Sequence, residues 1–187
     1  TLTCANGGIC QIGDTGPGGG RVFYMSSGFS APGTACNTSC MYLEAAPKTW
    51  SGGSNDPYFP WSGNTTTLIG SSAQGTSIGS GYANTAAIIA QSSTINRAAT
   101  KAQAYNGGGK SDWYLPSSEE MRALYFARDS VGSFVCDWYS TSTEYDASNH
   151  QLQHGCQDSA TPSTKGSNRY VRPIRAFSPT NTDVPMF

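Results

Sequence analysis

The chain has 187 residues, a formal net charge of −1, and only 12% charged residues, about half the share in an average soluble protein. This length suits one domain with a sizeable core, which we assign to residues 1–177, followed by a C-terminal tail at 178–187. A nearly neutral chain has no overall positive potential to attract phosphate backbones, so nucleic-acid binding is not expected. It also lacks an apolar run of roughly 20 residues, so membrane insertion is not expected.

The first part of the chain predicts two strands and a long loop. Residues 13–20 are mostly glycine and predict a tight turn, and the β-forming residues 21–25 after it predict a strand. Residues 41–45 predict a second strand. Ser, Gly, Thr and Asn then dominate residues 47–81, and loops of this length are usually functional or packed by their own aromatic residues. The aromatic residues in this loop are Trp50, Tyr58, Phe59 and Trp61.

Three helices are expected next. The Ala-rich stretches 82–90 and 94–105 predict two of them, ended by three glycines. The third, 117–128, begins with a capping box, in which Ser117 caps the helix and Glu120 reaches back to the cap residue. One face of this helix is apolar, with Met121, Leu124 and Tyr125.

Short alternating runs in the last third predict antiparallel strands at 138–144, 151–153 and 169–177. If 169–177 is one strand, Arg169 and Arg175 share a face and Arg172 lies on the other, so the arginines cannot all converge on one ligand. The tail from residue 178 is expected to be ordered only where it docks.

Six cysteines fall into three couples that are close in sequence: Cys4/Cys10, Cys36/Cys40 and Cys136/Cys156. Six cysteines allow fifteen pairings, and this clustering favours the local one. Zinc-ligand spacing is lacking, and oxidised cysteines indicate an exported protein that is secreted or displayed at the cell surface. The elements together predict an α+β fold with small twisted antiparallel sheets, two or three helices and long loops pinned by disulfides.

Six short sequences spread over residues 13–177 resemble segments of one protein family, and they occur in the same order as in that family. They are GDTGPGGGRVFY (13–24), YLEAAP (42–47), IGSGYANTAA (78–87), GGGKSDWYLPSSEEMRAL (107–124), YSTSTE (139–144) and YVRPIRAF (170–177). They are similar to the Lcl C-terminal domain family, the head domain of bacterial collagen-like surface proteins. This resemblance implies a domain that caps a secreted or surface-anchored bacterial protein and acts in adhesion.

A second similarity concerns architecture. The WYLPS string before a helix, the Ser/Thr-rich strand ending in Glu and the closing Val-Arg-Pro run resemble the C-type-lectin-like fold of formylglycine-generating-enzyme-like and phage receptor-binding proteins. That resemblance implies helices beside a small sheet with long ligand-binding loops. Relatives that bind sulfated glycosaminoglycans would need a cationic surface. With 11 Lys+Arg against 12 Asp+Glu, this chain makes a neutral glycan at least as good a candidate.

Candidate ligand contacts are aromatic rings, which stack on the apolar face of a sugar, and the polar groups beside them. The candidates are Trp61, Trp138, Tyr139, Glu144, Tyr145, Asn149, His150 and Gln153, with Arg169 and Arg172 for an anionic ligand. The other aromatic residues of the long loop, Trp50, Tyr58 and Phe59, are further rings that could stack on a sugar. A competing interpretation makes the aromatic residues a satellite core beneath a loop. It also pairs Arg172 or Arg175 structurally with Glu144 or Glu120.

Catalysis and cofactors find little support in the sequence. There is no Gly-x-Ser-x-Gly elbow, a Ser–His–acid triad could be drawn only from His150 or His154, and each cysteine has a disulfide partner, so no enzyme is expected. Calcium is the one cofactor to weigh, since oxygen-rich sites bind it. The acids available are Asp112, Glu119, Glu120, Glu144, Asp146 and Asp158. Because no calcium-loop or sugar-binding carboxylate motif is present, we expect these acids to be caps and surface groups.

The sequence therefore predicts a non-catalytic extracellular adhesion module that binds a glycan or another cell-surface or matrix partner. The alternative is a structural role, as a self-associating subunit or cap of an extracellular filament. The collagen-like relatives suggest a trimer, although no coiled coil or collagen segment in this chain would impose one.

Overall fold

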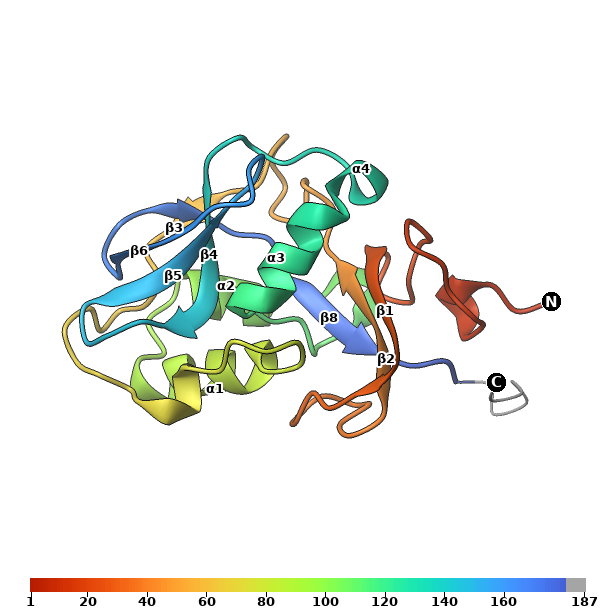
Figure 1. Cartoon of the computed structure of the whole chain (residues 1–187), viewed down its shortest axis with the longest axis horizontal. Helices are drawn as coiled ribbons and strands as arrows, with labels where there is room; N and C mark the ends of the chain where they lie inside the picture. The colour runs from red at the N-terminus through yellow and green to blue at the C-terminus, as the bar shows by residue number, and fades with distance from the viewer. Residues whose placement is uncertain (181–187) are drawn as a thin grey trace.

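A computed structural model describes residues 1–180 and has an α+β fold, in which two small sheets flank a central helix (Figure 1). The predicted class is confirmed. A three-stranded sheet has the order β1-β2-β8, and a five-stranded sheet has the order β3-β7-β4-β5-β6.

The three-stranded sheet is antiparallel and comprises β1 (Arg21–Phe29), β2 (Cys40–Ala45) and β8 (Ile174–Phe177). Both strands predicted in the first part of the chain are confirmed. β1 runs four residues beyond its predicted end, and its pairing with β2 has one irregularity of register inside the predicted strand and one in the extension. Its Phe23 packs in the main core with Leu43 of β2 and Ala176 of β8.

The five-stranded sheet is built on the hairpin of β4 (Trp138–Glu144) and β5 (Asn149–His154), with β6 (Ala160–Thr164) along one edge. Along the other edge lie β7 (Arg169–Tyr170) and β3 (Tyr58–Phe59). The β4–β7 pair is parallel, so this sheet is not purely antiparallel as predicted. The chain runs from Lys165, which contacts Glu144 at the end of β4, back to the start of β4 before β7 begins.

The single strand predicted at 169–177 is wrong. The run is divided into β7 and β8, which belong to different sheets. Pro173 in the break lacks the N–H that a central strand donates. Arg172 therefore sits between the sheets, and the expected division of the arginines over two faces of one strand does not apply.

The three predicted helices are confirmed as α1 (Gly81–Gln91), α2 (Ala98–Ala104) and α3 (Ser118–Phe126); a one-turn helix, α4 (Arg128–Val131), was not predicted. Three short 3₁₀ turns are η1 (Cys4–Asn6), η2 (Ser71–Ala73) and η3 (Gly107–Gly109). The capping box is present, since Ser117 Oγ accepts from Glu120 N and the Glu120 carboxylate accepts from Ser117 N. α3 lies between the sheets (Figure 1), where Met121 and Leu124 fill the main core.

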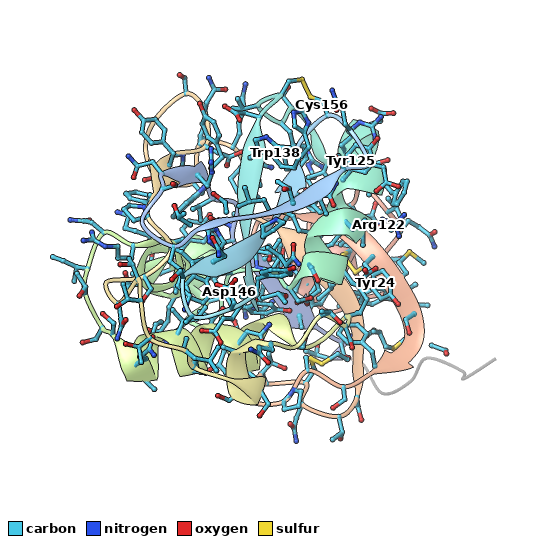
Figure 2. The ribbon with its side chains drawn as sticks, turned by 60° about the vertical axis from the view of Figure 1, so that its left-hand side comes forward. Tyr24, Arg122, Tyr125, Trp138, Asp146 and Cys156 are labelled. Carbon is cyan, nitrogen blue, oxygen red and sulfur yellow. A yellow bond between two sulfur atoms is a disulfide. The ribbon has the colours of Figure 1, made fainter. Side chains whose placement is uncertain are left out.

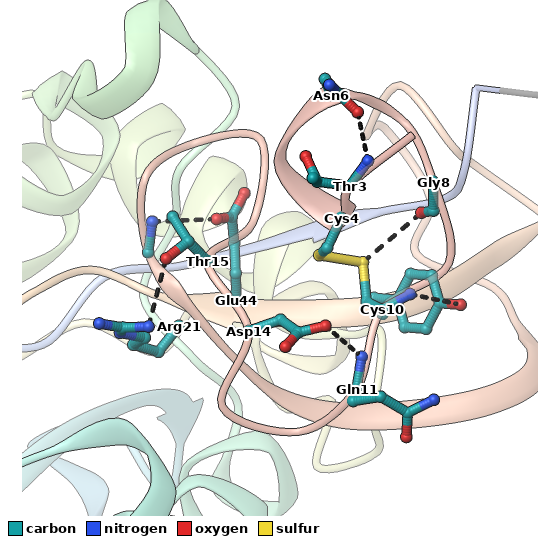
Figure 3. The surroundings of a disulfide bond; sticks show 12 residues. Thr3, Cys4, Asn6, Gly8, Cys10, Gln11, Asp14, Thr15, Arg21 and Glu44 are labelled. Atoms are coloured by element: carbon teal, nitrogen blue, oxygen red, sulfur yellow. Dashed lines mark hydrogen bonds between the residues drawn. A yellow bond between two sulfur atoms is a disulfide. The ribbon is translucent and has the colours of Figure 1, made fainter. Parts of the chain in front are cut away.

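All three local disulfides are confirmed: Cys4–Cys10, Cys36–Cys40 and Cys136–Cys156. The first one closes the N-terminal segment (Figure 3), where Cys10 N also donates to the Tyr42 hydroxyl. At the other end of the described chain, Thr180 N donates to Gly7 O, so residues 178–180 dock on this segment; the rest of the predicted tail lies outside the described residues. Across residues 1–180, no helix has the length and apolar character to cross a membrane.

Buried carboxylates hold the long glycine-rich loops in place. Glu44 accepts hydrogen bonds from Gly18 N at 2.8 Å and Gly20 N at 3.1 Å. A Cβ atom on Gly18 would lie 2.6 Å from the Trp113 ring, so only glycine fits there. Glu120 accepts from Gly81 N at 2.9 Å, and burial raises the pKa of its carboxyl. Loops without regular structure thereby gain fixed positions.

Candidate functional site

The ten candidate ligand residues fall into three groups in the structure. Six are buried, with at most 3% of each residue exposed: Trp61, Tyr139, Glu144, His150, Gln153 and Arg172. Tyr145 and Asn149 lie at the turn of the β4–β5 hairpin. Trp138 and Arg169 line a hollow at the opposite end of β4.

Glu144 is part of a buried polar cluster with Lys165, Trp61 and His150. Lys165 Nζ lies 2.8 Å from the Glu144 carboxylate and 5.1 Å from the centre of the Trp61 ring, on which His150 stacks at 5.3 Å. Burial raises the pKa of Glu144, but the Lys165 ammonium and the N–H groups of Gly70 and Ile69 outweigh it, and the pKa is lowered. Glu144 is therefore a buried carboxylate whose partners lie within the domain.

His150 is held neutral in the same cluster. Burial, reinforced by the charges of Arg169 and Lys165, lowers its pKa to about 3. One ring nitrogen lies 3.0 Å from Ser140 Oγ. A neutral, enclosed imidazole stacked on Trp61 serves packing, in line with the interpretation of these aromatic residues as core.

Arg172 forms a structural ion pair, as the competing interpretation held, but the expected partner is wrong. Its guanidinium donates twice to Asp56, each time at 2.6 Å, and lies 4.3 Å from the centre of the Phe134 ring. Tyr139 donates to the same carboxylate. Arg175 likewise pairs with Glu44 and Asp112. These partners are far apart in sequence, and no local pattern connects them.

The acids considered for calcium are dispersed over the molecule. Glu144 faces Lys165, Glu120 caps α3, Asp112 pairs with Arg175, and Asp146 accepts from Asn149 in the hairpin turn. Asp158 pairs with Arg122 on the surface. Within residues 1–180, no group of three or more His, Cys, Asp or Glu side chains is placed to hold a metal ion.

The β4–β7 hollow is a depression of about 220 Å³ at the start of these two strands. It is lined by Tyr58, Asp137, Trp138, Asn168, Arg169 and Tyr170. The parallel register pairs Tyr139 with Tyr170. Trp138 therefore lies level with Arg169, and Asp137 level with Asn168, because parallel strands advance side by side. Asp137 and Trp138 from one segment and Asn168, Arg169 and Tyr170 from the other together form the rim, while Tyr139 itself is fully buried.

The aromatic rings of the hollow are packed from behind and open in front. Tyr58 contacts Tyr170 edge-on at 5.7 Å between ring centres, while 59% of Tyr58 stays exposed. Trp138 is half-buried and meets the His154 ring edge-on at 5.0 Å. Such backing fixes the rings, so a ligand that stacks on them orders few side chains.

The polar side chains of the hollow are also positioned. Arg169 donates through Nε and Nη2 to Ser163 Oγ, at 3.2 and 3.1 Å, and Asp137 Oδ1 accepts from Trp138 N at 2.7 Å. The Cys136–Cys156 disulfide joins the two chain segments next to this rim. Figure 2 shows Trp138 and Cys156 at one end of the β4–β5 hairpin and Asp146 at the other.

A larger hollow, of about 320 Å³, is formed in part by the loop before β4. It is lined by Arg128, Asp129, Gly132, Ser133, Phe134, Gly155 and Cys156. Its cation is already engaged, since Arg128 donates to Tyr125 O and lies 4.4 Å from the centre of the Tyr125 ring. With one aromatic ring in its lining, it offers less for a ligand to stack on than the β4–β7 hollow does.

The sequence named Tyr58 among the aromatic candidates for stacking on a sugar, and Tyr58 lines the hollow. It did not place Asp137, Asn168 or Tyr170 at the site. The available signal was the repeat of a polar residue, a large side chain and Tyr at the start of two strands. No protein-family model matches this chain, and no curated protein matches it.

Proposed function

We propose that this domain is a secreted, non-catalytic adhesion module that binds a glycan or another surface ligand in the β4–β7 hollow. The observation that carries the proposal is the combination of Tyr58, Trp138 and Tyr170 with three polar side chains in one depression. Such rings stack on the apolar face of a sugar while the polar groups bond its hydroxyls.

Three further observations support an extracellular role. The three disulfides are compatible with an oxidising compartment. The strings that resemble the Lcl C-terminal domain family occupy structured positions, with YSTSTE in β4 and WYLPS directly before α3. The helices beside a small sheet with long loops are what the C-type-lectin-like resemblance implies, and we propose that fold for this chain.

The test is a glycan array followed by calorimetric titration of the best ligand. Tyr58→Ala and Trp138→Ala should each weaken binding about tenfold or more, equivalent to about 1.4 kcal/mol. Tyr145→Ala is the matched control, because Tyr145 is 54% exposed against 59% for Tyr58 but lies at the far end of β4. A blank array across neutral and sulfated glycans, or a loss confined to Tyr145→Ala, would contradict the proposal.

A separate observation favours self-association as a second candidate function. Residues 22–43 contain no charged residue, and they include most of β1, an edge strand of its sheet. Several apolar side chains are exposed at this end of the molecule, 40–51% each: Leu2, Ile9, Ile12 and Met25. Exposed strand edges pair with further strands, and protein interfaces are poor in charge at their centres.

Light scattering across a range of concentrations tests this second candidate. A self-associating subunit should form larger species as concentration rises, and Met25→Lys should suppress them. Leu68→Lys, at a residue 52% exposed outside this uncharged end, is the control and should leave the assembly unchanged. A monomer at every concentration would exclude the structural role.

A further inference from the structure

We infer that the β4–β7 hollow takes a neutral sugar ring at the end of a glycan chain, held by hydrogen bonds from adjacent hydroxyls to Asp137 and Asn168. This inference rests on the proposed function and names its ligand class. Three properties of the lining carry it: balanced charge, free hydrogen-bonding capacity and size.

The charge of the lining disfavours an ionic ligand. Arg169 and Asp137 are the charged members among the six residues that line the hollow. A sulfated or uronic sugar would be attracted by Arg169 but repelled by Asp137. A quaternary ammonium group would bind to the faces of the three rings but be repelled by Arg169. A neutral polyol uses both, because its hydroxyls donate to a carboxylate and accept from a guanidinium.

Two polar side chains at the rim have hydrogen-bonding capacity to spare. Asp137 Oδ1 is occupied by Trp138 N, while in the described part of the chain neither Asp137 Oδ2 nor the Asn168 amide makes a hydrogen bond to protein. Both residues are exposed. They directly precede β4 and β7, which pair side by side, and both line the same hollow. Paired strands are about 4.8 Å apart, so one sugar ring can reach both side chains through adjacent hydroxyls.

The size of the hollow points to one ring. Its volume of about 220 Å³ lies below the roughly 300–1,000 Å³ of most small-molecule sites. Tyr58 and Trp138 supply ring faces for stacking, and Arg169, tied to Ser163, closes part of the rim. The remaining sugars of the glycan would then lie outside the hollow, which makes the bound ring a terminal one.

The experiment titrates the purified full chain with methyl glycosides of neutral hexoses, with glucuronate, with a sulfated hexosamine and with choline. A neutral glycoside should bind, with an affinity that changes less than about twofold between low and high salt, because no counterions are released. Asp137→Asn and Asn168→Ala should each weaken this binding about tenfold. Asp129→Asn, in the larger hollow, is the control and should have no effect.

Each other outcome overturns a distinct statement. Binding of only the acidic or sulfated sugars, lost in Arg169→Gln and weakened by salt, would overturn the neutral class but keep the adhesion module. Choline binding would do the same in favour of a cation. Array binding that depends on Tyr58, with every single-ring compound inactive, would overturn the terminal ring. Absence of binding in both the array and the titrations would overturn the proposed function itself. Unchanged thermal unfolding of each variant confirms that it is folded.

Discussion

The two ends of β4 put similar residues to opposite uses. At its start, Trp138 is half-buried and the neighbouring polar side chains, Asp137 and Asn168, are exposed. At its end, Glu144 accepts from Lys165 Nζ and from the N–H groups of Ile69 and Gly70. An acid, an aromatic ring and a cation are present at both ends, and the difference is whether their hydrogen-bonding capacity is used inside the protein.

Physical chemistry explains why the buried end cannot also bind a ligand. A buried charge is tolerated only when it is paired and hydrogen-bonded. The side chains of Glu144 and Lys165 are both 0% exposed, so they are fixed partners, and a ligand could reach them only after the cluster opened. The exposed end has water as its partner, which a ligand can displace.

Removal of the buried cation should have the largest effect. Lys165→Met keeps the length of the side chain but leaves Glu144 charged and without its cation, and we expect a loss of about 3–5 kcal/mol in the free energy of unfolding. Denaturant titration measures this loss. The double variant Glu144→Gln/Lys165→Met should recover part of it, because no unpaired charge remains.

The surface pair of Arg122 and Asp158 is the control for Lys165. It is a well-formed salt bridge at 2.8 Å, with 46% and 39% of the side chains exposed. Exposed pairs contribute little, so Arg122→Met should leave the unfolding midpoint nearly unchanged. Equal losses of unfolding free energy in Lys165→Met and Arg122→Met would contradict the expected difference between a buried and an exposed ion pair.

Acid should destabilise the buried end through His150. Its pKa is about 3 in the folded chain against 6.5 for an ordinary histidine, so the folded state binds the proton less well. The stability that this difference provides is complete above pH 6.5 and is lost as the pH falls toward 3, by on the order of 4 kcal/mol. Unfolding measured from pH 7 to pH 3 should show the decline.

His150→Gln isolates this contribution, because glutamine does not titrate. Carboxyl groups also change protonation in acid, and they do so equally in both proteins. The difference in the free energy of unfolding between wild type and His150→Gln should therefore become smaller as the pH falls from 6.5. Parallel pH profiles for the two proteins would show that His150 is not held neutral by burial.

The sequence predicted local features well and distant ones poorly. The capping box at Ser117 and the three disulfides depend on residues close in sequence, and their patterns are direct. The pairing of Arg172 with Asp56 spans 116 positions. Such pairs arise from the topology, which periodicity does not reveal.

The candidate site shows the same limit. Trp138 and Arg169 were selected for their chemistry and do line the hollow, but so were Trp61 and His150, which are buried. An alternating pattern shows that a strand has two faces. It does not show which face is buried when other parts of the chain can cover either one. The parallel register of β4 and β7, which assembles the rim, depends on a two-residue strand that is too short to show an alternating pattern.

The third prediction concerns the cross-link beside the open end. Cys136→Ser/Cys156→Ser removes a disulfide across 20 positions, and the chain-entropy relation gives a loss of about 3 kcal/mol. Ligand affinity should fall as well, since Asp137 and Trp138 directly follow Cys136. Cys36→Ser/Cys40→Ser, across only 4 positions, should cost less stability and leave affinity intact; an affinity loss in this control would show that the effect is global.

The smallest effect on stability is expected for Trp138→Ala. Comparison with Trp61→Ala tests the exposed and the buried environment with the same residue type. Trp138 is half-buried and touches His154 by an edge contact, so its removal should cost only about 1 kcal/mol. Trp61 is fully buried and donates from its indole nitrogen to Thr141 O at 2.8 Å, so Trp61→Ala should cost about 3–5 kcal/mol. Thermal unfolding of both variants measures this difference in stability. In ligand titrations we expect the opposite order, with the larger effect for Trp138→Ala. Trp138→Ala loses binding while staying folded, whereas Trp61→Ala affects binding only through the folded fraction. If Trp138→Ala proves as destabilising as Trp61→Ala, the start of β4 belongs to the core, and the hollow is not a free surface.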